Sequence, residues 1–131
     1  MLALGIRQPW AELILLGHKT IEVRSTSVRH RGPIYIYAAK QLARIPAANA
    51  AAAKWNLEID QLPRGMVVGT VEIHDVREPE LPDDEAAASV PASLLAGKLC
   101  WDLANPVRLS EPLTPKYLPS GIWFYPFRPR S

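Results

Sequence analysis

The sequence predicts an α+β fold: a small mixed β-barrel of about six or seven short strands with two main helices. Short apolar runs with period-2 alternation recur along the chain, and turn residues separate them. Both clear helical patterns fall before residue 56. The 13 prolines among 131 residues suit short strands joined by defined loops. An open α+β sandwich is the alternative architecture.

The first strand is predicted over residues 2–6, and a helix follows it at once. Pro9 suits the first helical position, where its missing N–H costs no hydrogen bond. The spacing from Trp10 through Ile14 to Gly17 gives this helix one apolar face. Gly17 is well placed to end the helix in the left-handed conformation.

A second strand is predicted over residues 20–25, where alternation places Glu22 and Arg24 on one face and apolar residues on the other. Residues 33–39 give a third strand.

An alanine-rich helix is predicted over residues 47–55 and ends near Trp55, which we expect to be the most exposed of the four tryptophans. The other three, Trp10, Trp101 and Trp123, are expected in the core.

The longest strand is predicted over residues 66–76, and Gly69 within it indicates a bulge or sharp bend. Residues 77–96 are acidic and rich in proline and alanine. We interpret them as a variable excursion from the barrel, with a short helix near residues 91–96.

The end of the chain is predicted to add three short strands. Residues 99–103 and 107–109 would flank a turn at Asn105-Pro106, and residues 121–127 would follow a proline-rich loop.

Length and composition indicate one domain over residues 1–131. No apolar run reaches the ~18 residues that a membrane span needs, and the N-terminus does not resemble a signal peptide, so we expect a cytoplasmic protein that does not bind a membrane. One cysteine and three widely spaced histidines give no metal-ligand pattern, so we expect no metal and no cofactor.

Charge is distributed unevenly. Residues 1–65 hold nine Lys or Arg and four Asp or Glu, whereas residues 66–131 hold six and nine. A basic face would suit a polyanionic partner such as a nucleic acid, although uneven scatter in a small protein gives the same count.

The motif G-x-K-x-x-E-x-R brings three charged residues together within eight positions. It consists of Gly17, Lys19, Glu22 and Arg24. The arginine offers a planar fork for a phosphate or a base edge, and the glutamate can accept hydrogen bonds from a base. A lysine near an arginine loses its proton more readily and can serve as a base. The alternative is a surface pair of Glu22 with Arg24 beside a solvated Lys19, worth under ~1 kcal/mol.

The chain resembles the ASCH domain family, relatives of the PUA RNA-binding domains. The segments that carry the resemblance keep their order over nearly the whole chain: Ile6-Arg7-Gln8-Pro9-Trp10-Ala11, the G-x-K-x-x-E-x-R motif, Arg31-Gly32-Pro33-Ile34, Gly65-Met66-Val67-Val68-Gly69, Trp101 and Gly121-Ile122-Trp123.

The resemblance implies a PUA-like barrel whose cleft is lined by the motif, and a role in binding nucleic acid. Some family members bind DNA or RNA, whereas others hydrolyse N4-acylated cytidines or cut RNA. In the amidohydrolase branch a threonine three residues after the motif lysine is the nucleophile. Glu22 stands at that position here, and the nearest threonine, Thr20, has the wrong offset.

We therefore expect a nucleic-acid-binding protein, with RNA as the leading partner and DNA or a nucleotide-like small molecule as alternatives. Lys19, Glu22 and Arg24 would bind it, and Arg7 and Arg29 would extend the positive surface.

Two other functions stay open. One is hydrolysis of a modified nucleoside or of RNA, with Lys19 as base and Glu22 or Glu72 assisting. The other is a protein-interaction module whose partner binds residues 77–96.

Overall fold

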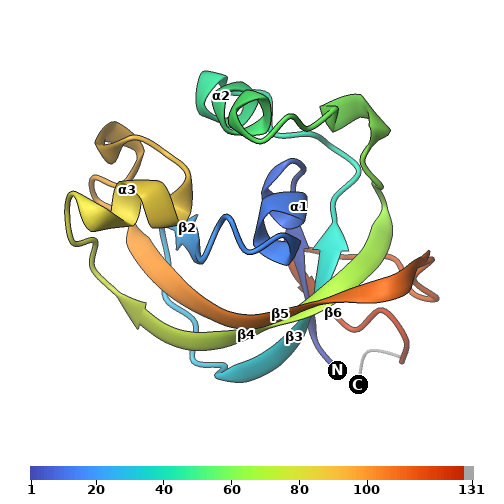
Figure 1. The fold of residues 1–131 in the computed structure, drawn as a ribbon. Helices are drawn as coiled ribbons and strands as arrows, with labels where there is room; N and C mark the ends of the chain where they lie inside the picture. Colours follow the sequence, from blue (N-terminus) through green and yellow to red (C-terminus); the bar gives the residue numbers. More distant parts are fainter. Residues whose placement is uncertain (129–131) are drawn as a thin grey trace.

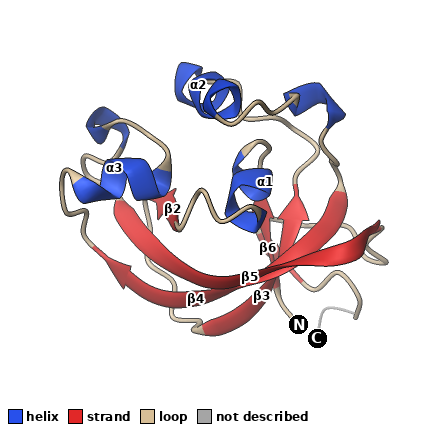
Figure 2. Cartoon of the chain, viewed as in Figure 1, coloured by secondary structure: helices blue, strands red, loops and turns tan. Residues whose placement is uncertain are grey.

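The computed structural model describes residues 1–128 as a six-stranded mixed sheet that curls into a half-barrel, with the helices on its concave side and at its rims (Figures 1 and 2). The strand order is β2-β5-β4-β3-β1-β6. Only β1 and β3 pair in parallel, and the other neighbours within residues 1–128 are antiparallel. The predicted α+β barrel is confirmed, as a curled sheet that stays open between β2 and β6.

The strands are β1 (Ala3–Ile6), β2 (Ile21–Arg24), β3 (Gly32–Ala38), β4 (Met66–Arg77), β5 (Leu99–Leu113) and β6 (Trp123–Phe124). The helices are α1 (Trp10–Leu15), α2 (Pro46–Lys54) and α3 (Asp83–Ala88), with short 3-10 turns at Ile59–Gln61 and Ala92–Leu94. None of the helices in the described part of the chain has the length and apolar character to cross a membrane.

The main core fills the space between α1 and the concave face of the sheet. Its fully buried members include Ile6, Ile14, Ile36, Ile73 and Trp101. Strand alternation places the strand residues of this set on one face of the sheet, and α1 covers them with the apolar face that contains Ile14. Gly17 follows α1 with φ +82°, as its predicted role in ending the helix requires.

Gly69 forms the predicted bulge in β4. The register between β4 and β5 shifts next to it. A Cβ on Gly69 would lie 2.5 Å from the Val107 carbonyl oxygen and would also collide with Leu15 of α1. The missing side chain therefore lets the helix and the neighbouring strand approach the bent part of β4.

The predicted turn at Asn105-Pro106 is wrong, because β5 runs unbroken through it. Thr70 pairs with Val107 and Glu72 with Ala104, so β5 carries an extra residue there and forms a bulge. Asn105 takes the left-handed conformation in this bulge, with φ 52°. A bulge accommodates Pro106, which has no N–H to give to the ladder.

The acidic segment 77–96 is an integral part of the fold rather than an excursion from it. It contains α3, which was not predicted from the sequence, and Ala88, Val90 and Leu95 bury a second core cluster with Ile21 and Cys100. Only a 3-10 turn forms where a short helix was expected. Helix α3 is short and has few apolar residues, so its sequence carries almost no periodic signal.

Arg77, the last residue of β4, fixes α3 to the sheet. Its guanidinium donates to Asp84 at 2.7 and 3.0 Å and to Asp102 at 2.8 and 3.0 Å. These bonds raise the pKa of Arg77 and lower the pKa of the Asp84 carboxyl. Asp84 is 5% exposed, so its charge needs this partner.

Candidate functional site: a cleft at the open edge of the barrel

A cavity of about 740 Å³ lies where the sheet fails to close. Glu22, Val23 and Arg24 of β2 line one part of its wall. Gly5 of β1 and Ile122, which precedes β6, line another part. The other lining residues come from α1, the end of β3 and the surrounding loops: Arg7, Trp10, Lys19, Tyr37, Ala39, Lys40, Gln41, Ile45, Val90, Leu94, Leu118, Pro119 and Gly121. The charged residues of the motif therefore share one concave site.

Lys19 is buried at the wall of this cavity. Its side chain is 3% exposed, and its Nζ donates to the Ala88 carbonyl oxygen at 2.6 Å. The same atom lies 4.8 Å from the centre of the Trp10 ring, close enough for a cation–π contact. The alternative of a solvated Lys19 is wrong, because α3 and α1 enclose the amine.

Glu22 and Arg24 form a tight pair on one face of β2, as alternation predicted. Arg24 Nε and Nη2 donate to Glu22 Oε2 at 2.9 and 2.7 Å. The other oxygen, Oε1, lies 3.9 Å from Lys19 Nζ, beyond hydrogen-bond distance. Lys19 and Glu22 both line the cavity. Glu22 Oε1 can therefore accept a hydrogen bond from a ligand there, and the amine can donate another.

Arg24 also links β2 to β1 across the opening of the sheet. Its Nη2 donates to the carbonyl oxygen of Gly5 in β1 at 3.0 Å. The guanidinium lies 5.8 Å from the centre of the buried Trp101 ring. The hydrogen bonds to Glu22 and Gly5 use Nε and Nη2, so the arginine positions Glu22 and the cleft wall as well as contributing charge.

The electrostatics of the site depend on burial. Desolvation lowers the pKa of Lys19, and the charge of Arg24 lowers it further, whereas Glu22 and the Cys100 thiol act in the opposite direction. Glu22, which lies 3.9 Å from the amine and is shared with Arg24, does not offset the effect of burial. The free amine is therefore more populated on Lys19 than on an exposed lysine at the same pH.

Of the two further arginines predicted to bind the ligand, Arg7 lines the cavity. Its side chain is exposed and donates to Gln41 Oε1 at 3.1 Å. Arg29 is exposed in the loop before β3 and does not line the cavity. Arg7 can therefore meet a ligand held in the cleft, whereas Arg29 can reach only a ligand that extends beyond it.

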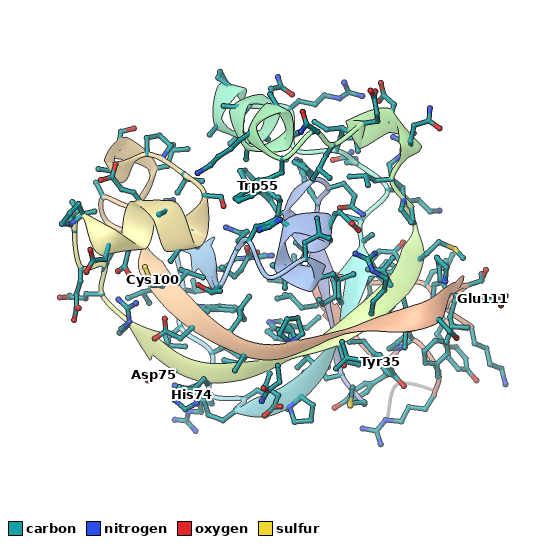
Figure 3. The ribbon with its side chains drawn as sticks, in the orientation of Figure 1. Tyr35, Trp55, His74, Asp75, Cys100 and Glu111 are labelled. Atoms are coloured by element: carbon teal, nitrogen blue, oxygen red, sulfur yellow. The ribbon has the colours of Figure 1, made fainter. Side chains whose placement is uncertain are left out.

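Glu72 lies on the opposite side of the sheet from the cleft. Its neighbours Val71 and Ile73 are buried in the concave core, so alternation turns Glu72 outward with His74, which Figure 3 shows on the convex side. Glu72 Oε2 accepts a hydrogen bond from Asn105 Nδ2 at 2.8 Å. The structure does not bring Glu72 to Lys19.

Trp10, Lys40 and Gln41 were not predicted from the sequence as cleft residues. Trp10 was expected in the core alone, yet its ring forms part of the cavity wall. Tyr37 is 3% exposed and lines the cavity, and burial raises the pKa of its phenol. Lys40 and Gln41 follow β3 closely, and their position just after a predicted strand was the one signal for them.

The mouth of the cavity has a basic part and an apolar part. Arg7 and Lys40 supply the positive charge. Four aliphatic side chains that line the cavity are also exposed by 39 to 71%: Ile45, Leu94, Leu118 and Ile122. A ligand that fills the cleft therefore meets both charge and apolar surface.

The fold and the site together define a curled, mixed β-barrel with a polar cleft at its open edge. A family model for the ASCH domain matches residues 4–113, and the chain belongs to the ASCH domain family. A search of curated proteins found no match.

Two solved structures share the fold. The crystal structure of ASCH from Zymomonas mobilis is 14% identical, with a TM-score of 0.60, over 95% of this chain and 85% of that chain. A tyrosine-to-phenylalanine mutant of the Zymomonas mobilis protein is also 14% identical, with a TM-score of 0.55, over 86% of this chain and 74% of that chain.

Proposed function

We propose that this ASCH domain binds RNA, and that the cleft at the open edge of the barrel receives one nucleotide of it. The observation that supports this most is the convergence of Lys19 and Glu22 on one cavity, with a lysine amine and a free carboxylate oxygen 3.9 Å apart. Nucleobase edges present donors beside acceptors, which this pair matches.

The surroundings of the pair suit a nucleotide as well. Trp10 and Tyr37 give the cavity aromatic walls for a planar base. Arg7 and Lys40 lie at the mouth, where a phosphate would emerge. Arg29 would contact the RNA strand beyond the cleft. A DNA strand offers the same groups except the 2′-hydroxyl, so DNA is the natural comparison ligand.

Titration with single-stranded RNA at low salt tests this proposal. We expect binding that weakens as salt rises, and a clear loss of affinity in Lys19→Met and in Glu22→Gln. Lys116→Ala is the matched control, because Lys116 is exposed and does not line the cavity. Absence of binding, or equal affinity in wild type and all three variants, would exclude the cleft as the RNA site.

Hydrolysis of a modified nucleoside is a second candidate, favoured by the lowered pKa of Lys19, which would let the amine act as a general base. The threonine nucleophile of the amidohydrolase branch is replaced by Glu22, and Glu72 lies on the outer face, so any catalysis must rest on Lys19 and Glu22. Assays with N4-acetylcytidine and with short RNAs test it, and turnover that survives Lys19→Met would exclude Lys19 as the base.

A protein partner at residues 77–96 also stays a prediction, as does a cytoplasmic location. Deletion of the segment would remove buried Ala88 and Leu95, so exposed positions are the ones to change. Leu81→Ser and Asp83→Lys alter only exposed residues. A partner that binds both variants as well as it binds wild type does not use this surface.

A further inference from the structure

We propose that Lys19 is a carbonyl-reactive amine, which forms a reversible imine with small aldehydes that enter the cleft. The favoured aldehyde has a planar body and an anionic group. This activity goes beyond the proposed binding of RNA and does not depend on it.

The geometry gives an aldehyde one route to the amine. Lys19 lines the cavity, yet its side chain is only 3% exposed. An aldehyde must therefore enter the cavity to react, and the cavity selects which carbonyl compounds arrive. The other four lysines of the chain are exposed and have no such selection.

Burial favours the neutral form of the amine, while the groups packed around it act in both directions. From β2, Glu22 Oε1 lies 3.9 Å from Nζ and favours the charged form, whereas Arg24, which binds Glu22 Oε2, is a cation that favours the neutral form. The α3 contact is a neutral carbonyl, that of Ala88, and β5 contributes the Cys100 thiol. Burial lowers the pKa of Lys19 among these groups, so its lone pair is more available than that of an exposed lysine.

The step balances without an outside oxidant or reductant. The Nζ lone pair attacks the carbonyl carbon, a C–N bond forms, and the carbonyl oxygen becomes a hydroxyl. Glu22 Oε1, 3.9 Å from Nζ, can carry one proton from the nitrogen to the carbonyl oxygen, which forms this hydroxyl, and then the second proton to the departing hydroxyl. The C–O bond breaks and water leaves, so amine and aldehyde give imine and water.

The imine would fit the same surroundings. When the imine nitrogen takes up a proton from solvent, its single N–H can donate to the Ala88 carbonyl oxygen. Its positive charge would lie near the face of the Trp10 ring, where Nζ now sits at 4.8 Å. The aromatic wall favours a planar aldehyde, and Arg7 and Lys40 at the mouth favour one that carries an anion.

Reductive trapping with pyridoxal 5′-phosphate and cyanoborohydride tests the proposal. The trap reduces the imine to a secondary amine, and peptide mapping then measures the modification of each lysine. We expect Lys19 to be modified faster than Lys40, Lys54, Lys98 and Lys116 in the folded protein. In urea the five lysines should react alike.

Two further comparisons test whether the basic mouth of the cavity selects an aldehyde that carries an anion. Pyridoxal lacks the phosphate, so it should label Lys19 more slowly than pyridoxal 5′-phosphate does. An Arg7→Gln, Lys40→Gln variant should remove that difference, because both changes lie at the exposed mouth.

The proposal is overturned if Lys19 in the folded wild type is modified no faster than the exposed lysines. That result needs no variant, so a misfolded mutant cannot obscure it. It would leave the RNA titration unaffected, and a failed RNA titration would equally leave this result standing.

Discussion

At the residue scale, the site depends on three side chains of the motif that differ in role. Lys19 and Glu22 present an amine and a free carboxylate oxygen to the cleft, whereas Arg24 holds Glu22 and joins β2 to β1. The shared face of Glu22 and Arg24 could be predicted from alternation. The burial of Lys19 could not, because α3 and its Ala88 carbonyl belong to a segment about 70 residues away in sequence.

Arg24→Met should destabilise the domain by about 2–3 kcal/mol, somewhat less than the ~3–5 kcal/mol for a fully buried pair, because Arg24 keeps 22% exposure. The variant leaves Glu22 buried without its partner. Urea unfolding measures the loss. The double variant Glu22→Gln, Arg24→Met should recover part of it, and a double variant no more stable than the single one would contradict the pairing argument.

Lys19 should make stability rise with pH. Its pKa in the folded state is below the ordinary value of 10.5, so the unfolded state binds more protons between the two values. The free energy of unfolding therefore increases as pH rises from the folded-state pKa toward 10.5. Lys19→Met should lack this slope in a urea series at alkaline pH, and parallel curves for both proteins would show that Lys19 titrates normally.

At the element scale, α3 connects an ion-pair network to the cleft. Arg77 binds Asp84 at the start of the helix, and the carbonyl of its last residue, Ala88, accepts from Lys19. The order of β1, α1 and β2 could be predicted from periodicity and from Gly17. α3 could not, since its stability comes from Asp84 and the core contact of Ala88 rather than from an apolar pattern.

Arg77→Met should loosen α3 and weaken ligand binding in the cleft, because Lys19 loses a fixed acceptor. Hydrogen exchange at residues 83–90 should accelerate, and stability should fall by about 3 kcal/mol. Arg108→Met is the control: its pair with Glu12 is 46% exposed on the arginine side, so we expect a loss of ~1 kcal/mol or less. Equal exchange rates in wild type and Arg77→Met would refute the connection.

The Asp84 carboxyl gives the same element a dependence on acid. Its pKa is lowered in the folded state, so its contribution is complete above the ordinary value of 3.8 and is lost as pH falls through the folded-state pKa. The stability difference between wild type and Asp84→Asn should shrink over that range, as urea unfolding at a series of acidic pH values would measure. A difference that stays constant below pH 3.8 would argue against the lowered pKa.

At the scale of the whole molecule, the open edge of the barrel creates both the cleft and the need for Arg24. The barrel itself could be predicted from short alternating strands and from Gly69. Its incomplete closure could not be predicted, because whether the two edge strands, β2 and β6, meet depends on long-range contacts that no local pattern encodes.

Gly69 tests how tightly the curled sheet is assembled. Gly69→Ala should cost about 1–3 kcal/mol, since the new methyl group would meet Leu15 and the Val107 carbonyl oxygen. Gly121→Ala has open space around it and should change stability little. Thermal unfolding compares them, and equal melting temperatures would contradict the close approach of α1, β4 and β5.

The most direct test of RNA binding in the cleft is to map contacts on the folded domain by amide chemical shifts during a titration with a short single strand. We predict that the shifts gather at Lys19, Glu22, Lys40 and Ile122 around the cleft, while Glu72 and His74 on the outer face stay unchanged. Shifts confined to the outer face, or to the exposed part of residues 77–96, would contradict binding in the cleft.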